Sequence, residues 1–355
     1  MTQIPMYDPE KTFEENFEQG PSGDFADGKI FQTQGEPEYD FFGNKLFLPF
    51  GIPNGPLINS KYVTAALDKG FDLVEYKDVR SRKLACNPMP NLLAIHPKGE
   101  YTLEQAEQGI LTNQQYEQPI SAVNSYGIPS MAPDFWQEDL KKAMAYAKKG
   151  QLVIAGVQAT LQETGGFEAY LEDFVLDTKL VKETNPKVVE VNLSCPNEGA
   201  ANLLCFDIER SQKVTYAVKN VLGNIPLIIK IAYFPDKKQL QKFVQAVGSI
   251  ADAIAAINTI PTKVLDQAGQ NAFPDGRKTG GACGYAIQKF GLETTKNLKQ
   301  FREELRLQYK IIGIGGVTKP EDYITYKDAG ADVIMSAIGA MRNPYLAQEI
   351  KALVK

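Results

Sequence analysis

Residues 188–197 of this chain read VVEVNLSCPN. A short run rich in β-branched valine ends in two carboxamides that bracket a thiol and a proline. Such runs are typical of strands buried in a sheet, and the point where a buried strand ends is a common place for chemistry. In the alternative interpretation, Pro196 only stops the strand, and Asn192 and Asn197 cap the backbone of a turn. The stretch alone leaves both interpretations open.

The composition of the chain is that of a globular protein. It has 355 residues, of which 43% are hydrophobic and 23% are charged, which argues against disorder. The net charge is −5 and there is no basic run, so we expect binding neither to nucleic acid nor to an anionic membrane. No stretch approaches the roughly 20 apolar residues of a membrane helix.

The cysteine and histidine contents limit the possible chemistry. Four cysteines are scattered along the chain without a CxxC pair, and His96 is the sole histidine. We therefore expect reduced thiols in the cytoplasm, no metal site and no iron–sulfur cluster. A secretory signal is not expected either. A histidine base is nearly excluded.

The first 45 residues are predicted to form an acidic N-terminal extension. Positions 1–40 carry ten acidic and two basic side chains, unlike a basic transit peptide. The preferred interpretation is a disordered tail. Scattered aromatic side chains give the alternative, in which the extension packs on the body of the protein: Phe13, Phe17, Phe25, Phe31, Tyr39, Phe41 and Phe42.

From residue 46 onward, strand and helix patterns alternate. Eight apolar runs are predicted to be strands: 46–52, 71–76, 152–157, 188–193, 227–232, 253–257, 310–314 and 332–336. Segments with helical periodicity lie between most of them and after the last: 143–149, 167–182, 207–222, 237–247, 286–305, 320–328 and 344–354.

Eight strand–helix units in about 300 residues predict an α/β fold, a (β/α)8 TIM barrel over residues 46–355, with an enlarged loop after the second strand. The alternative is an open, doubly wound sheet. That fold would place a GxGxxG turn after the first strand, and no such turn follows it there.

Polar side chains follow several of the predicted strands. Lys77, Lys230 and two asparagines, Asn192 and Asn258, all stand at carboxyl ends. A single lysine there could simply extend to solvent. Because the carboxyl ends of all barrel strands meet at one face, we expect these four groups to form a site.

Small residues after the last two strands indicate a phosphate site. Residues 312–318 read IGIGGVT and residues 336–339 read SAIG. Free backbone amides in such turns bind phosphate, and phosphate sites recur at this place in barrels. The glycines could also serve turn geometry alone. The loop 279–284, TGGACG, could approach the same ligand or lie on the surface.

These features resemble the dihydroorotate dehydrogenases, most closely the class 1 enzymes, from about residue 46 to 353. The most specific element is NLSCPN at 192–197. Supporting elements are Lys77 with NPMP at 87–90, NSYGIP at 124–129, Lys230, NT at 258–259, Gly280-Gly281 and IGGV at 314–317.

The resemblance implies that FMN lies across the mouth of the barrel and that the pyrimidine stacks on its ring. It implies flavin contacts by Pro53, Asn54, Gly55, Lys77, Asn192, Lys230, Asn258, Gly280, Gly281, Gly315, Gly316, Ala337 and Ile338. It implies substrate contacts by Lys77, Asn124, Tyr126, Gly127, Ile128, Asn192, Asn197, Asn258 and Thr259.

The implied reaction is the oxidation of (S)-dihydroorotate to orotate in pyrimidine biosynthesis. The substrate loses a hydride from C6 to flavin N5 and a proton from C5 to a base. The resemblance implies that Cys195 is this base and that Lys77 contacts both substrate and flavin. A thiol has a pKa of about 8.5, so it serves as a base without a histidine partner. We expect Cys86, Cys205 and Cys283 to be inert.

Several positions depart from the pattern of the family. Pro53 and Asn54 replace small residues at the end of the first strand, and Asp78 replaces a small hydroxyl residue after Lys77. Tyr126 and Ser130 are also unusual, Ala337-Ile338 replaces Gly-Thr, and the segment 90–123 is long. These changes fall mainly at positions expected to contact the flavin. They leave the asparagines expected to bind the substrate unchanged.

Alternative functions remain at this point. The chain could act on another dihydropyrimidine, could be an aldolase-type or isomerase-type barrel that binds phosphate without a redox cofactor, or could be an FMN-binding pseudoenzyme. The resemblance implies a homodimer and either fumarate as electron acceptor or NAD through an iron–sulfur flavoprotein partner subunit. Quinone is less expected, because the N-terminal extension does not resemble a membrane-docking arm.

Overall fold

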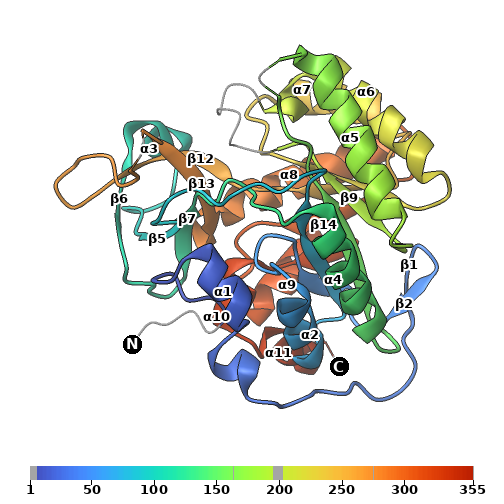
Figure 1. The fold of residues 1–355 in the computed structure, drawn as a ribbon, viewed down its shortest axis with the longest axis horizontal. Helices are drawn as coiled ribbons and strands as arrows, with labels where there is room; N and C mark the ends of the chain where they lie inside the picture. Colours follow the sequence, from blue (N-terminus) through green and yellow to red (C-terminus); the bar gives the residue numbers. More distant parts are fainter. Residues whose placement is uncertain (1–5, 163, 195–202, 275, 355) are drawn as a thin grey trace.

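The computed structural model of this chain describes residues 6–354 except 163, 195–202 and 275. Its centre is a closed barrel of eight parallel strands, in the order β10-β11-β14-β15-β3-β4-β8-β9 (Figure 1). The strands are β3 (Phe50–Ile52), β4 (Leu73–Val79), β8 (Leu152–Val157), β9 (Val189–Asn192), β10 (Leu227–Ile231), β11 (Ala253–Ala256), β14 (Lys310–Ile314) and β15 (Val333–Met335). The predicted (β/α)8 barrel is therefore confirmed.

Helices follow the barrel strands and surround them (Figure 1). They are α2 (Ser60–Asp68), α4 (Pro133–Tyr146), α5 (Gly166–Lys182), α6 (Ile208–Leu222), α7 (Lys237–Val247), α8 (Gln288–Glu304), α9 (Pro320–Ala329), α10 (Ile338–Arg342) and α11 (Leu346–Leu353). In the described part of the chain, none of the helices has the length and apolar character needed to span a membrane.

The predicted helix at 143–149 is wrong in its bounds, because α4 begins ten residues earlier, at Pro133. Proline suits the first turn of a helix, where its missing amide proton is not needed. At the other end, Ala147 has a ψ of 130°, outside the helical range, and the helix ends there. The helix α2 was not among the predicted segments. It begins after Asn59, whose side chain accepts from the amide of Lys61.

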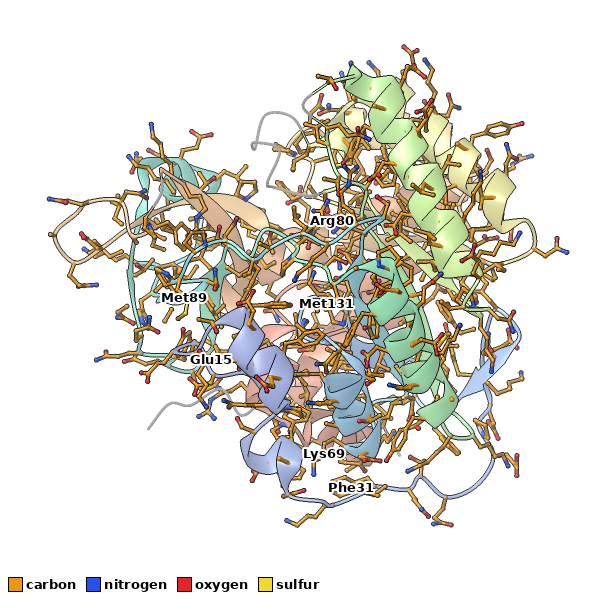
Figure 2. All side chains as sticks on the ribbon, viewed as in Figure 1. Glu15, Phe31, Lys69, Arg80, Met89 and Met131 are labelled. Atoms are coloured by element: carbon orange, nitrogen blue, oxygen red, sulfur yellow. The ribbon has the colours of Figure 1, made fainter. Side chains whose placement is uncertain are left out.

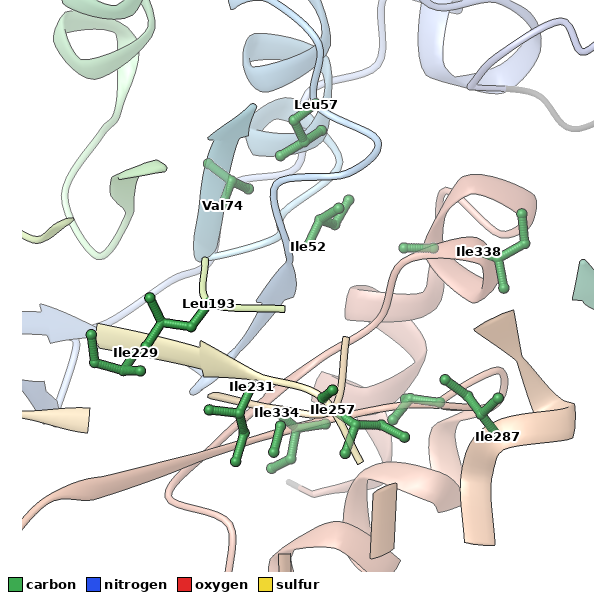
Figure 3. Packing of buried hydrophobic residues seen from close by; sticks show 14 of the residues in the cluster. Ile52, Leu57, Val74, Leu193, Ile229, Ile231, Ile257, Ile287, Ile334 and Ile338 are labelled. Atoms are coloured by element: carbon green, nitrogen blue, oxygen red, sulfur yellow. The ribbon is translucent and has the colours of Figure 1, made fainter. Parts of the chain in front are cut away.

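Strand alternation divides the core into two layers. On β10, Ile228 belongs to the apolar cluster inside the barrel, whereas Ile229 and Ile231 belong to the cluster shared with the helices. Figure 3 shows both of the latter among the buried side chains. Lys230 stands between them in the sequence and therefore shares the interior face with Ile228. On the neighbouring strands, the same alternation of side chains points polar residues into the barrel.

The enlarged loop predicted after the second barrel strand is present, and it carries three strands and a short helix of its own. Strands β5 (Leu92–Ile95), β6 (Ile110–Asn113) and β7 (Ser121–Asn124) combine with β12 (Ile260–Leu265) and β13 (Thr279–Gly284) into a second closed sheet. A short helix, α3 (Leu103–Gln108), precedes β6. This five-stranded sheet stands beside the barrel (Figure 1).

Residues 6–45 pack on the body of the protein, so the disordered-tail expectation is wrong for them. The side chains of Met6, Tyr7, Phe13 and Phe25 are buried. Helix α1 (Phe13–Gln19) begins with a capping box, and Tyr62 Oη on α2 donates to its Asn16 carbonyl at 2.9 Å. The division at residue 45 stays a prediction.

Farther along the arm, contacts with the body continue. The amide of Phe31 donates to the carbonyl of Asp68 at 2.7 Å, and Phe31 lies beside Lys69 (Figure 2). The hairpin of β1 (Tyr39–Phe41) and β2 (Asn44–Leu46) adds Phe41 and Leu46 to the cluster inside the barrel. The first barrel strand therefore begins at Phe50, later than the predicted residue 46.

Phe13→Ala tests whether the arm is an integral part of the fold. Because the ring is only 6% exposed, we expect its removal to lower the free energy of unfolding by about 3 kcal/mol. Chemical denaturation measures the change. Ile30→Ala is the matched control, since Ile30 is 50% exposed in the same arm. Equal, negligible effects of both substitutions would contradict integral packing.

Candidate active site

A cavity lies at the carboxyl ends of the barrel strands. Its wall comes from the barrel, from β7 and β13 of the five-stranded sheet, and from the arm through Tyr7 and Phe13. Fourteen of the residues predicted from the sequence line it: Pro53, Asn54, Gly55, Lys77, Asn124, Tyr126, Gly127, Ile128, Asn192, Lys230, Asn258, Thr259, Ala337 and Ile338. The geometry thus brings together side chains that are up to 285 residues apart in sequence.

Four predicted glycines are not among the lining residues: Gly280, Gly281, Gly315 and Gly316. Two of them allow close packing next to the cavity. A Cβ on Gly281 would lie 2.3 Å from Thr259 Oγ1, and one on Gly316 would lie 2.4 Å from Gln288 Cβ. Their roles as flavin contacts stay predictions. The other two predicted residues, Cys195 and Asn197, lie outside the described residues.

Lys230 places a positive charge inside the barrel. Its Nζ donates to Asn54 Oδ1 at 2.8 Å and lies 3.4 Å from Glu190 Oε1. Burial acts to lower the pKa of Lys230, but the facing carboxyl groups, Glu190 first and then Glu75, outweigh it, and the pKa is raised. The ammonium group therefore stays protonated at neutral pH. Lys77, on β4, lines the same cavity and is 9% exposed.

The three described carboxamides are held by fixed hydrogen bonds. Asn192 Oδ1 accepts from the amide and the hydroxyl of Ser194, both at 3.0 Å. Asn258 Nδ2 donates to the Ser194 carbonyl at 3.0 Å, and Asn124 Nδ2 donates to the Gly281 carbonyl at 3.1 Å. These bonds fix the direction in which each amide faces the cavity, as the recognition of a planar ligand requires.

The unusual Asn54 and Asp78 bind each other. Asn54 Nδ2 donates to Asp78 Oδ1 at 2.5 Å, and Asn192 Nδ2 donates to Asp78 Oδ2 at 3.0 Å. Each carboxylate oxygen therefore has a donor. The two unusual residues therefore contact each other, since the carboxylate on β4 takes one of its donors from the amide after β3.

The loop after β7 carries backbone strain. Ile128 has a φ of 50°, which is costly for a β-branched residue. Arg80, labelled in Figure 2, holds this turn, because its Nε donates to the Ile128 carbonyl at 2.9 Å and its guanidinium donates to Ala159 at 2.6 Å. Tyr126, in the same loop, meets Tyr7 of the arm edge to face, with ring centroids 5.6 Å apart.

Sequence reasoning missed Glu75 and Glu190, which are both fully buried beside Lys230. The signal was present in the spacing. Glu75 stands two residues before Lys77, and Glu190 stands two residues before Asn192, so each points to the same face of its strand as a predicted site residue. The contribution of Tyr7 and Phe13 was also missed, because nothing in the sequence fixes where the arm packs.

The described thiols are poor proton acceptors. Burial raises the pKa of Cys86, Cys205 and Cys283 to about 12. Of these three, Cys283 lines the cavity. His96 is exposed and does not line it. Within the described residues, neither a histidine nor an activated thiol faces the cavity.

Comparison with known proteins identifies the family. The dihydroorotate dehydrogenase family model matches residues 99–355. A dihydroorotate dehydrogenase from Dictyostelium discoideum is 33% identical over 97% of this chain and 96% of its own length. The catalytic subunit of a dihydroorotate dehydrogenase B (NAD(+)) from Thermodesulfovibrio yellowstonii is 28% identical over 66% of this chain and 72% of its own.

A third relative, a dihydroorotate dehydrogenase (quinone) from Psychrobacter cryohalolentis, is 24% identical over 90% of this chain and 86% of its own. The family model covers well over half of the chain, and the Dictyostelium relative covers nearly all of it. This chain belongs to the dihydroorotate dehydrogenase family.

Proposed function

We propose that this protein uses FMN to oxidise (S)-dihydroorotate to orotate in pyrimidine biosynthesis. Membership of the family supports the reaction. The observation that supports this reaction for the present chain is the cavity. It is lined by two lysines and three asparagines: Lys77, Lys230, Asn124, Asn192 and Asn258. Amide groups match the N–H and C=O groups of a pyrimidine, and a lysine matches its carboxylate.

The residues present fit FMN. The cavity combines an apolar surface from Ile257, Ile314 and Ile338 with the buried ammonium group of Lys230, as a flat, partly polar ring requires. At the ends of the last two barrel strands, the backbone amides of Gly316 and Ala337 donate to no backbone carbonyl among the described residues, which suits the binding of a phosphate.

In this proposal some of the residues contact the flavin and others contact the substrate. When bound, FMN supplies a ring that accepts a hydride. Lys230 holds a positive charge against that ring, and Asn54 fixes the position of its ammonium group. Asn124, Asn192 and Asn258 orient the pyrimidine, and Lys77 contacts its carboxylate. Tyr7 and Phe13 help to exclude water from the cavity.

Cys195 is the proposed base, to take the proton from C5. Two observations support this assignment. Burial raises the pKa of Cys86, Cys205 and Cys283 to about 12, so at neutral pH they hold far less of the proton-accepting thiolate than an ordinary thiol with a pKa of about 8.5. The residues that precede Cys195, Asn192 and Ser194, are buried at the carboxyl end of β9, next to the cavity.

Anaerobic reduction of the flavin tests the function. We expect the purified protein to carry FMN and its visible absorbance to bleach when dihydroorotate is added without oxygen. Dihydrouracil is the matched ligand control, since it lacks the carboxylate that Lys77 is proposed to bind. Bleaching by dihydrouracil alone would indicate another dihydropyrimidine as substrate. A fully loaded flavin that neither compound reduces would contradict dehydrogenase activity.

The class of enzyme and its partners belong to the same proposal. The cysteine in the NLSCPN motif favours class 1, with a homodimer in the cytoplasm. The NAD-dependent relative is described as a catalytic subunit, which supports a possible iron–sulfur flavoprotein partner. Reoxidation of the reduced protein by fumarate, by a quinone, or by NAD with and without such a partner identifies the acceptor.

A further inference from the structure

Three carboxyl groups lie close to Lys230 inside the barrel. Glu75 and Asp78 from β4 and Glu190 from β9 have oxygen atoms within 4.8 Å of one another. Glu75 and Glu190 are 0% exposed and Asp78 is 2% exposed. If all three were ionised, Lys230 would balance only one of the three charges, and isolated buried charges are very costly.

The hydrogen bonds around Asn54 indicate that a proton is present. Asn54 Nδ2 carries two hydrogens, but it has three carboxyl oxygens around it, from Asp78 at 2.5 Å, Glu190 at 3.2 Å and Glu75 at 3.4 Å. Its backbone amide adds a bond to Glu75 Oε2 at 3.1 Å. Two hydrogens cannot serve three anionic acceptors at once, so a proton on one of the carboxyl groups would relieve the crowding of negative charge around Asn54.

The positions of the partners assign this proton to the pair of glutamates. Lys230 Nζ lies 3.4 Å from Glu190, which favours the charged form of that carboxyl group. Asp78 receives donors on both oxygens. Glu75 makes no ion pair within 4.0 Å among the described residues, although Lys77 shares its face of β4 two residues later. Glu190 Oε2 has no partner among the described residues, so it is open to a proton donated by Glu75.

We propose that Glu75 and Glu190 share one proton at neutral pH, so that the pair presents a single negative charge to Lys230. Glu75 is then a positioning residue that acts through Glu190, Asn54 and Lys230 on the bound flavin. The inference about the flavin rests on the proposed function. The inference about the proton does not.

The pKa directions agree with this geometry. The pKa of Glu75 is raised well above its ordinary value, by burial first and then by Glu190. The pKa of Glu190 is also raised by burial, but Lys230 opposes the rise. The charged groups that act most strongly on Glu75 are Glu190 from β9, Lys230 from β10 and Asp78 from its own strand. Lys77 also shares the face of Glu75 on β4. The adjoining strands β3 and β8 contain no charged residue.

The flavin midpoint potential at pH 7 provides the first test. A shared proton predicts non-additive substitutions. In Glu75→Gln, Glu190 still carries the one charge, so the potential is expected to match that of the unsubstituted protein. In Glu190→Gln, Glu75 can ionise instead, so the shift is small. The double variant loses the charge, and the ratio of reduced to oxidised flavin should rise about tenfold at a given potential, a shift of about 30 mV for a two-electron couple.

The opposite results are equally definite. Single shifts that are each sizeable and that add up in the double variant would mean that both glutamates are ionised, and the proposal would be overturned. An unchanged double variant would overturn the link to the flavin. A potential that moves when the unsubstituted protein is treated with EDTA would show that a cation, and not a proton, balances the cluster.

The second test needs no flavin chemistry. A raised pKa means that the folded protein keeps a proton that the unfolded chain loses above pH 4.5, so stability falls as pH rises above that value. Glu75→Gln removes this loss. Its free energy of unfolding should exceed that of the unsubstituted protein at pH 7 to 8, and the difference should vanish near pH 4. Its infrared spectrum at pH 7 should lack one un-ionised carboxyl band.

Asp177→Asn is the matched control. Asp177 on α5 is also fully buried, both of its oxygens lack a partner among the described residues, and burial raises its pKa. The substitution should reproduce the gain in stability and leave the flavin potential unchanged. If Glu75→Gln shows no stability gain and no lost band, the shared proton is wrong even if dihydroorotate reduces the flavin. If the stability gain and the lost carboxyl band are both observed but dihydroorotate does not reduce the flavin, only the proposed function is wrong.

Discussion

Replacing Cys195 by alanine should slow the reduction of the flavin by dihydroorotate about 10²- to 10⁴-fold, the usual contribution of a positioned general base. Cys195→Ser should retain part of the rate and shift the pH optimum upward, because a hydroxyl loses its proton at a higher pH than a thiol. Anaerobic stopped-flow measurements at saturating dihydroorotate report this rate directly.

Cys205→Ala is the matched control for this experiment. Cys205 is fully buried and does not line the cavity, and burial raises its pKa to about 12. We expect its loss to affect stability and to leave the rate of flavin reduction unchanged. A Cys195→Ala protein that binds substrate and reduces its flavin at the unsubstituted rate would exclude Cys195 as the base.

Lys230→Met is expected to have the second large effect. It removes the cation that faces Glu190 and leaves Asn54 Oδ1 without its donor. Breaking a buried ion pair costs about 3–5 kcal/mol of folding free energy. The flavin should also become harder to reduce, with about a hundredfold lower ratio of reduced to oxidised form, or roughly 60 mV for a two-electron couple.

Lys351→Met separates these two consequences. Lys351 is 8% exposed and its Nζ lies 2.9 Å from Asp72 Oδ1, so it is also a buried lysine in an ion pair. It does not line the cavity. We expect a loss of stability without a change in flavin potential. An unchanged potential in Lys230→Met as well would mean that this charge does not act on the flavin.

The barrel was predictable because most of its strands are dominated by apolar residues. Residues 152–157 are buried throughout. A short apolar run of this kind between helical segments is best interpreted as a buried strand of a parallel sheet. The same regularity located Lys77 and Lys230, since a lysine that ends such a run is conspicuous. The family motif then identified the carboxamides.

The five-stranded sheet could not be predicted in this way. Its strands are short, and they pair across large sequence distances, as in Gly281 with Asn124. No local pattern specifies such a partner. The arm was misjudged for a related reason, because its acidic surface dominates its composition while the few buried rings, such as Phe13, carry its packing.

The buried glutamates illustrate a different limit. A glutamate within a strand is usually taken as a solvent-facing residue, since it is almost never fully buried without a partner. The partner of Glu190 is Lys230, on the neighbouring strand β10, 40 residues later. Only the closed barrel shows that both side chains point to the same interior.

The five-stranded sheet is built from two excursions of the chain, which leave the barrel after its second and sixth strands. The barrel supplies Lys230 and Asn192, whereas the sheet supplies Asn124. Mutations in these excursions can reshape the side of the cavity that is proposed to bind the substrate, without changing any of the eight central strands. We therefore expect evolutionary drift in substrate preference to be concentrated in residues 80–130 and 260–284, and these are the segments to randomise in directed evolution toward other cyclic substrates.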